Sequence, residues 1–184
     1  MCLERYIVEQ CAPTLASLKT GALFGVIDPD SAELLRQAEH WRSRLADKGL
    51  VLSVLRCRKG RALIYLGRLS QLERDLAAPG AAELLKRCGY ASHSCPEALE
   101  TLRRRVLSEE GFPHEIGVFL GYPLPDVLGY IQNRGKNSKL TGFWQVYGDA
   151  DEAARSFRRY RKCSELYRRL YDSGRGLMQL TVGA

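Results

Sequence analysis

Three residues of types that can do covalent or acid–base chemistry are Cys11, His114 and Glu115. A cysteine thiolate can serve as a nucleophile when a histidine acts as its base, but only the fold could bring Cys11 and His114 together. His114 and Glu115 begin "HEIGV", the first half of the HExxH zinc-protease motif, and Val118 occupies the place of the second histidine. Because that metal ligand is missing, metalloprotease chemistry is not expected. A cysteine/histidine-dependent enzyme remains an alternative.

The cysteines give little support for a bound metal. None has CxxC spacing, and the closest grouping is "CGYASHSC", which contains Cys88, His93 and Cys95. Three ligands at irregular spacing do not match a structural zinc site, so no metal is expected. The dipeptide Cys95-Pro96 resembles a short haem-contact motif, which keeps iron or haem handling as a further alternative. We expect the six cysteines to be reduced thiols, most of them buried.

Two short stretches could bind an anion. In "NRGKNSK", Gly135 is a natural helix stop, and Lys136, Asn137 and Lys139 follow it. A glycine-bent loop with lysines and free backbone N–H groups can hold a phosphate, although this one lacks the Walker pattern GxxxxGK[ST]. Lys19 in "SLKTG" is a further candidate, at a spacing that departs from the SxxK of serine acyl-enzymes. We therefore predict Lys19, Gly135, Lys136, Asn137 and Lys139 as ligand-binding residues; an ordinary solvated loop is the alternative.

Most of the positive charge lies in one segment. The chain carries a formal charge of +7, and residues 155–169 alone hold seven Lys/Arg and one Glu, which leaves 21 basic and 20 acidic residues elsewhere. With about 100° per residue, the apolar residues of this segment fall on one side of a helix and the cations on the other. This pattern predicts a surface for an acidic partner or ligand, with a solvated outer face or non-specific nucleic-acid binding as alternatives. The predicted partner-docking residues are Arg155, Arg158, Arg159, Lys162 and Arg169.

The stretch 114–139 has the spacing of a helix-turn-helix. Pro113 and Pro125 suit helix starts, and Gly121 suits the turn between them. The second helix, however, would present residues such as Asp126 and Gly129 where a DNA-reading helix needs Arg, Lys, Asn or Gln. We therefore expect a helix-turn-helix-like pair at 113–134 that does not read a DNA sequence.

The elements that must position these residues alternate between strands and helices. This order predicts an α+β protein, an α/β-type sandwich with a mixed, partly antiparallel sheet covered by helices. Expected helices are "LERYIVEQCAPTLA" cut by Pro13, a helix capped by Asp28 or Asp30, one near residues 81–88, one opened by "SCPE", and the basic segment. Expected strands are "GALFGVI", the hairpin "LVLSVLRC" and "RALIYLGRL", then "TGFWQVY" and "GLMQLTV".

Length and composition are those of an ordinary globular protein. The 184 residues are 45% hydrophobic and 27% charged, which fits one domain over residues 1–184. No apolar run is long enough to span a bilayer, and the N-terminus lacks the basic and apolar regions of a secretory signal. A cytoplasmic location is expected.

Three segments of the sequence resemble a known family: "CAPTLASLKTGALF", "FPHEIGVFLGYPLPDV" and "GKNSKLTGFWQVYGDADEAARSF". In order and spacing the chain resembles the bacterial domain-of-unknown-function family 3793, from about Cys11 to Val182. The resemblance implies no particular reaction or cofactor. The site residues it suggests are Cys11, Lys19, His114, Glu115, Gly135, Lys136 and Asn137, and whether they share one pocket is a question for the structure.

Overall fold

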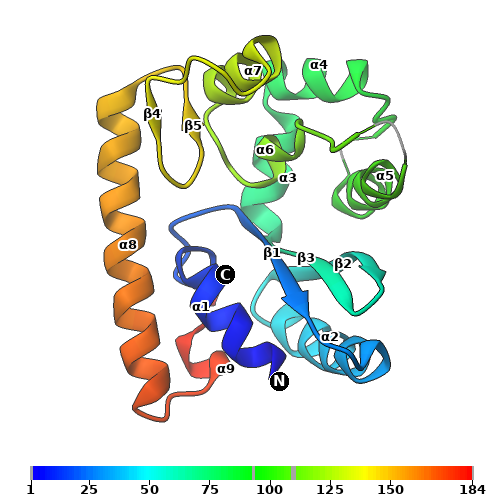
Figure 1. The fold of residues 1–184 in the computed structure, drawn as a ribbon, viewed down its shortest axis with the longest axis vertical. Coiled ribbons are helices and arrows are strands. Elements are labelled where there is room, and N and C mark those ends of the chain that lie inside the picture. Colours follow the sequence, from blue (N-terminus) through cyan, green and yellow to red (C-terminus); the bar gives the residue numbers. More distant parts are fainter. Residues whose placement is uncertain (1, 93, 109–110, 184) are drawn as a thin grey trace.

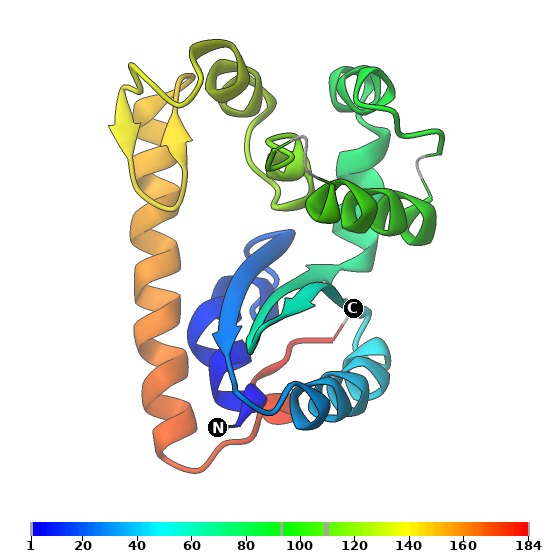
Figure 2. The same cartoon turned by 45° about the vertical axis from the view of Figure 1, so that its right-hand side comes forward.

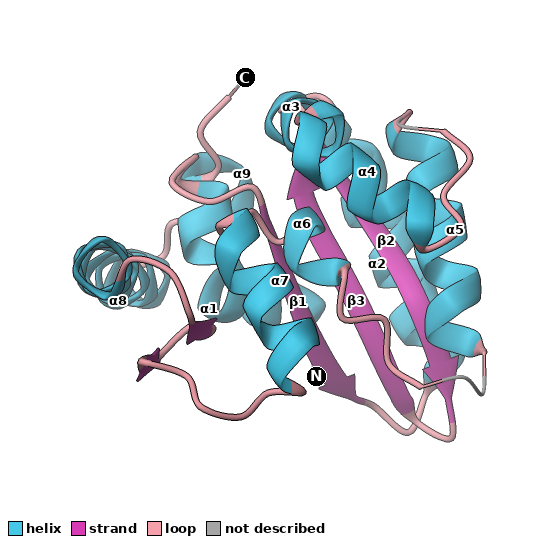
Figure 3. Ribbon diagram, turned by 90° about the horizontal axis from the view of Figure 1, so that it is seen from above, coloured by secondary structure: helices cyan, strands magenta, loops and turns pink. Residues whose placement is uncertain are grey.

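A small antiparallel sheet with helices on both faces forms the centre of the molecule (Figure 1). The computed structural model describes residues 2–92, 94–108 and 111–183. The sheet contains β1 (Gly21–Ile27), β2 (Leu50–Arg58) and β3 (Arg61–Arg68) in the order β1-β3-β2, with both pairings antiparallel. Figure 3 shows the three strands crossing beneath the helices of one face. The predicted α+β class is confirmed.

One face of the sheet packs on α1 (Leu3–Leu15) and α2 (Ser31–Ala46). Asp30 caps α2 by accepting the backbone N–H of Glu33, as one of the two predicted caps. Arg68 of β3 is buried and fastens the end of α1, because its guanidinium donates to the carbonyls of Thr14 (2.7 Å), Leu15 (2.6 Å) and Val182 (2.8 Å). Cations are favoured at a helix C-terminus, where the carbonyl groups lack partners within the helix.

The other face packs on four helices: α3 (Leu69–Ala77), α4 (Pro79–Arg87), α5 (Cys95–Leu107) and the single turn α6 (Ile116–Phe119). Tyr65 of β3 is completely buried there, and its hydroxyl donates to the carbonyl of Phe119 at 2.8 Å. This bond ties α6 to the middle strand of the sheet, because a buried hydroxyl needs a partner.

The hairpin β2–β3 turns at Lys59 and Gly60, both at positive φ (51° and 70°). Two such residues are the signature of a type I′ turn, whose twist matches the strands, so the predicted hairpin around "RKG" is confirmed. β2 is an edge strand. The Nε of Arg42 in α2 donates to the outward carbonyl of Leu52 at 3.3 Å and covers part of that edge.

The rest of the chain forms α7 (Leu124–Asn133), a hairpin of β4 (Leu140–Thr141) and β5 (Gln145–Val146), the long α8 (Ala150–Asp172) and the short α9 (Leu177–Leu180). α8 runs along one side of the molecule, with the β4–β5 hairpin beside its N-terminal half and α1 beside its C-terminal half (Figures 1 and 2). In the described part of the chain, no helix is both long and apolar enough to cross a membrane.

Two predicted strands are wrong. "GLMQLTV" contains the helical turn α9: Leu177 and Leu180, three residues apart, are both buried in the core cluster that contains α1, and Gln179 caps the N–H of Gly176. "TGFWQVY" is broken by a turn at Gly142–Trp144, which leaves two strands of two residues each. α3 was not predicted, because the apolar run of β3 continues into it.

The predicted helix-turn-helix-like pair is present as α6 and α7, with Gly121 in the turn at φ 70°. The first helix has only four residues. Asp126, Val127 and Gly129 of the second helix are buried, so they could not contact bases. Pro13 lies inside the last turn of α1, two residues before its end, and does not cut the helix earlier.

Candidate functional site

The outer face of α8 is exposed and positively charged. Its five predicted docking residues are all exposed: Arg155, Arg158, Arg159, Lys162 and Arg169. Arg155 forms an ion pair with Glu152 (Nη2–Oε2, 2.8 Å). The other four make no ion pair with a carboxylate among the residues that the structure describes. The charge of this face is therefore largely uncompensated within the chain.

The sequence of α8 explains why its cations point outward. Asp149 caps the helix by accepting the N–H groups of Asp151 (3.0 Å) and Glu152 (2.9 Å). Phe157 and Tyr160 are buried on the inner face, where they pack with Trp144 of the hairpin. Since burial of the apolar residues fixes the rotation of the helix, the arginines are left facing solvent.

One exposed apolar residue lies within this charged face. Leu166 is 45% exposed and falls within about 60° of Arg155, Arg159, Lys162 and Arg169 at 100° per residue. The stripe from Arg155 to Arg169 extends over about 21 Å of helix. We call it the α8 stripe: Arg155, Arg158, Arg159, Lys162, Leu166 and Arg169. The stripe has one exposed apolar side chain among exposed cations.

The predicted anion-binding loop follows α7. Arg134 and Asn137 adopt positive φ (52° and 60°), as does Gly135 (72°). The N–H groups of Gly135, Lys136 and Lys139 donate to backbone carbonyls of the protein, and the ammonium of Lys139 donates to Gly148 O at 2.8 Å. The backbone N–H groups of Gly135, Lys136 and Lys139 are therefore not free to bind an anion. The loop presents the side chains of Arg134 and Lys136 to solvent.

Cys11 and Lys19 are neighbours in the interior. Cys11 is fully buried in the cluster on the α1 side of the sheet, and burial raises the pKa of its thiol far above the ordinary value. A buried, protonated thiol is a poor nucleophile. Lys19 is also buried, its ammonium donates to Gly21 O at 2.5 Å, and burial lowers its pKa to about 8. Its Nζ lies 5.1 Å from the ring centroid of Tyr122.

His114 and Glu115 are adjacent in sequence and face different surroundings. Glu115 is buried, accepts the hydroxyl of Tyr90 at 3.1 Å and forms an ion pair with Arg105 of α5 at 2.5 Å. It therefore ties the start of α6 to α5. His114 is exposed, and its ring lies 5.0 Å from that of Tyr130. Cys11 packs in a different part of the molecule from His114, so the two do not form a nucleophile–base pair.

Two of the residues considered as metal ligands, Cys88 and Cys95, lie at the two ends of the segment that joins α4 to α5. Cys88 is half-buried after α4, Cys95 is buried as the first residue of α5, and His93 lies outside the described residues. Burial raises the pKa of Cys95 to about 11. Among the positions that the structure describes, no group of three or more His, Cys, Asp or Glu side chains is placed to hold a metal ion.

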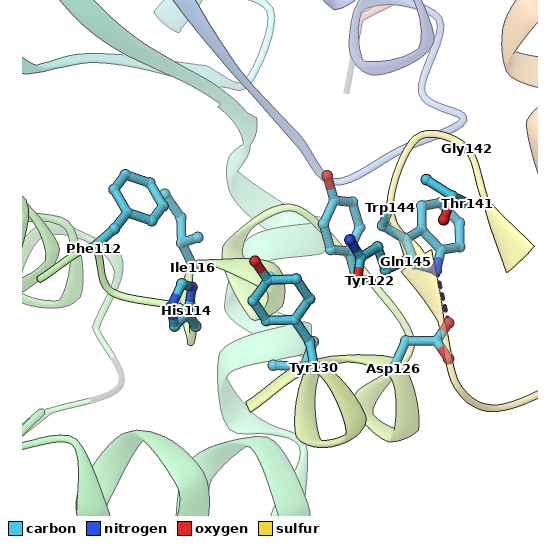
Figure 4. Close-up of a pocket in the computed structure, with 12 residues that line it drawn as sticks. Phe112, His114, Ile116, Tyr122, Asp126, Tyr130, Thr141, Gly142, Trp144 and Gln145 are labelled. Atoms are coloured by element: carbon cyan, nitrogen blue, oxygen red, sulfur yellow. Dashed lines mark hydrogen bonds between the residues drawn. The ribbon is translucent and has the colours of Figure 1, made fainter. Parts of the chain in front are cut away.

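A cavity of about 310 Å³ opens between α7, the segment before α6 and the β4–β5 hairpin (Figure 4). Aromatic rings form much of its lining: Phe112, His114, Tyr122, Tyr130 and Trp144. Figure 4 shows Tyr130 between His114 on one side and Tyr122 with Trp144 on the other. Of the seven residues suggested by the family resemblance, only His114 lines this cavity. The structure does not bring those seven into one pocket.

The wall of the cavity is held in place by Asp126. This carboxylate is 3% exposed, and it accepts three N–H groups: Trp144 Nε1 (2.7 Å), Tyr147 N (2.8 Å) and Gly148 N (2.7 Å). Hydrogen bonds to a charged acceptor are stronger than those between neutral groups. Asp126 thus joins the first turn of α7 to the hairpin and orients the indole of Trp144.

Close packing completes the same wall. Tyr122 and Trp144 are stacked, with ring centroids 4.9 Å apart and planes at 27°. The Cβ of Tyr147 lies so close to Gly129 that no side chain would fit at that position of α7. The glycine that weakens α7 as an isolated helix therefore allows the hairpin to approach it.

The sequence indicated His114 as a candidate site residue but gave no sign of the other residues that line the cavity. Asp126 was considered only as a residue with the wrong charge for DNA. Its position as a single acid between apolar residues in the first turn of a helix could have indicated a buried carboxylate. The aromatic pairs Tyr122 with Trp144 and His114 with Tyr130 are far apart in sequence, so no local pattern could have revealed them.

The fold is that of an α+β protein, with a cationic helix along one side and an aromatic cavity between α7 and the β4–β5 hairpin. The chain belongs to the family described as "Protein of unknown function (DUF3793)", whose model matches residues 7–181. The suspected family is therefore confirmed. The chain matches none of the curated proteins and none of the solved structures with which it was compared.

Proposed function

We propose that this protein is a binding module that docks an acidic partner protein on the α8 stripe. The observation that carries the proposal is the exposure of Arg158, Arg159, Lys162 and Arg169 without an intramolecular carboxylate partner in the described residues. Arginines spaced three and four apart on a helix repel one another, so an opposing acidic surface would lower the energy of the bound state.

Leu166 favours a protein over a nucleic acid as the partner. Protein interfaces commonly place an apolar contact at the centre and polar groups around it. Nucleic-acid backbones are contacted by cations, hydroxyls and backbone amides, and a leucine adds nothing to a phosphate contact. The stripe is convex, whereas small-molecule sites are concave, so an anionic small molecule such as a phosphorylated cofactor or nucleotide is a less suitable occupant.

The ligand-binding role predicted for Lys136 and its loop fits the same proposal. Arg134 and Lys136 are exposed at the end of α7, and their charge adds to the attraction of an acidic surface. Lys19 is buried behind Tyr122 and has no part in docking. We also propose that residues 1–184 act as one domain, since the two larger core clusters share the strands of one sheet.

Binding of acidic and nucleic polyanions to the purified protein tests the proposal. Poly-L-glutamate and single-stranded DNA of similar charge are titrated by fluorescence anisotropy over a range of salt concentrations. We expect poly-L-glutamate to bind more tightly, with an affinity that falls steeply as salt is added. The triple variant Arg158→Glu, Arg159→Glu, Lys162→Glu should reduce this affinity at least about tenfold.

The matched control changes the same number of charges on the β2–β3 hairpin. Arg56, Arg58 and Arg61 are exposed and form no ion pair in the described residues. Changing these three to Glu should reduce poly-L-glutamate binding much less than the change on α8. Equal losses in the two variants would contradict a specific docking surface, and tighter binding of DNA would replace the acidic protein with nucleic acid as the partner.

A further inference from the structure

We propose that the cavity between α7 and the β4–β5 hairpin is a binding site for a small, uncharged, planar heteroaromatic molecule. This site is separate from the α8 stripe and does not depend on the function proposed for it. The argument rests on the size of the cavity, the chemistry of its walls and the sign of its charge.

The size of the cavity limits the ligand to a few rings. Its volume of about 310 Å³ lies at the lower end of the range of about 300–1,000 Å³ typical of small-molecule sites. A bicyclic or tricyclic molecule fits such a space. A dinucleotide or a peptide segment does not.

The walls favour a flat ring. The rings of Phe112 and Tyr130 both lie near His114, with centroids 6.3 and 5.0 Å from that of the imidazole (Figure 4). Trp144 is held in place by Asp126 and by stacking on Tyr122. Aromatic rings prefer offset-stacked or edge-to-face partners at such separations, so a planar ligand gains more here than a chain or a saturated ring.

Polar groups at the cavity suit the edge of a heteroaromatic ring. The imidazole of His114 and the hydroxyl of Tyr130 make no hydrogen bond with any described residue, although both line the cavity. Gln145 lies at the same wall, its Oε1 is 3.2 Å from the hydroxyl of Tyr147, which also donates to Lys136 O at 3.0 Å, and its amide N–H groups make no hydrogen bond with a described residue. A few such groups amid apolar walls give a small-molecule site its orientation and specificity.

The charge of the cavity argues against an anion. Among the described residues no lysine or arginine lines it, and the one carboxylate among them, that of Asp126, has both oxygens occupied by N–H donors. A phosphate or carboxylate would therefore lose its hydration without gaining a cation. An organic cation would have to compete with those donors for a carboxylate that is already satisfied. An uncharged ring avoids both costs.

The fluorescence of Trp144 provides the measurement. The protein has two tryptophans, and the variant Trp41→Phe leaves Trp144 as the reporter. A panel of neutral bicyclic heteroaromatics, with quinoxaline as the reference compound, is titrated against this protein. The matched comparison compounds are quinoxaline-2-carboxylate, benzyltrimethylammonium and cyclohexanol. Binding to the unaltered protein is followed in parallel by ligand-observed NMR.

We expect saturable binding of panel members, at least about tenfold tighter than that of the anion, the cation and the saturated ring. Thr141→Trp, at an exposed position that lines the cavity, should block binding by filling the space. Tyr130→Ala should weaken binding by about tenfold or more. Tyr171→Ala removes a ring that packs in the α1-side core cluster and should leave the affinity unchanged.

Three results would overturn the proposal. The first is tighter binding of the carboxylate, the cation or cyclohexanol than of any neutral heteroaromatic. The second is binding that survives both Thr141→Trp and Tyr130→Ala. The third is the absence of binding by the whole panel at millimolar concentration, in protein whose circular dichroism shows the helical fold.

Discussion

The α8 stripe and the aromatic cavity lie on the two sides of one packing layer, and they present opposite kinds of surface. The inner face of α8 supplies Phe157, whose ring meets that of Trp144 edge-on at a centroid distance of 4.5 Å, and Trp144 lines the cavity. The outer face of the same helix carries cations in full contact with water. The excess positive charge thus lies where solvent screens it, and no cation is among the described residues that line the cavity.

This difference shows that the net charge of a protein does not identify the charge of its ligand. A formal charge of +7 suggests that any ligand of the protein would be an anion. In the folded protein the excess of cations lies on a convex helix, while the described residues of the cavity include one acid, Asp126, whose two oxygens are hydrogen-bonded. The two surfaces are therefore expected to select different partners, and variants that separate them test the distinction.

The largest effect on stability is expected from Asp126→Ala. The change leaves the N–H groups of Trp144, Tyr147 and Gly148 without their acceptor in a buried wall. We expect the free energy of unfolding to fall by about 2–4 kcal/mol, as measured by urea denaturation. Asp47→Ala, at an exposed acid after α2, is the control and should change stability by less than about 0.5 kcal/mol. Equal effects would mean that the cavity wall does not depend on Asp126.

A smaller, pH-dependent effect is expected from Lys19→Met, which removes the buried cation behind Tyr122. Burial lowers the pKa of Lys19 from 10.5 to about 8, so between these values the unfolded chain binds more protons than the folded one. Stability from this group therefore rises with pH across that window. Relative to Lys19→Met, the wild type should gain on the order of 2 kcal/mol from pH 8 to 10.5.

Urea denaturation of both proteins at several pH values measures this difference, because the other titrating groups are common to both. Lys162→Met on the exposed face of α8 is the control, and a much smaller change with pH is expected for it. A difference in stability between the wild type and Lys19→Met that stays constant or falls with rising pH would contradict the lowered pKa of Lys19.

The smallest effect is expected from neutralising the α8 stripe. Arg158→Gln, Arg159→Gln, Lys162→Gln relieves repulsion between cations three and four residues apart. The free energy of unfolding should rise by a few tenths of a kcal/mol at low salt. The gain should disappear at high salt, because exposed charges are then screened. A loss of stability at low salt would indicate that these residues are compensated within the chain after all.

Local sequence signals predicted the parts of the fold that local physics controls. The cap of α2 at Asp28 or Asp30, the hairpin of β2 and β3, and the amphipathic pattern of α8 each depend on residues within a few positions of one another. The identity of α9 could not be predicted, because the four helix-forming residues "LMQL" are too few to decide against the strand-forming Thr181 and Val182 that follow, and the helical turn depends on packing against α1. Tertiary packing overrides such weak local preferences.

The two candidate sites also differ in whether local sequence could predict them. The charged face of α8 was predictable because it is the outer side of a single helix. The cavity was not, because Asp126 meets Trp144 only when α7 and the hairpin are docked. Whether Cys11 and His114 meet could be settled only by the fold, which places Cys11 in the core on the α1 side of the sheet.

The clamp at Arg68 has a consequence for the order of assembly during synthesis. Arg68 holds the end of α1 and the carbonyl of Val182 together, while Val182 N donates to Leu15 O at 3.0 Å. α1 also packs along α8, more than a hundred residues further on. The side of α1 that packs on α8 therefore stays uncovered until α8 has been synthesised, whereas its other side can pack on β1 and β3 earlier. Shielding of the uncovered side by a chaperone in the interval would matter more for α1 than for a helix that packs only with its neighbours in the sequence.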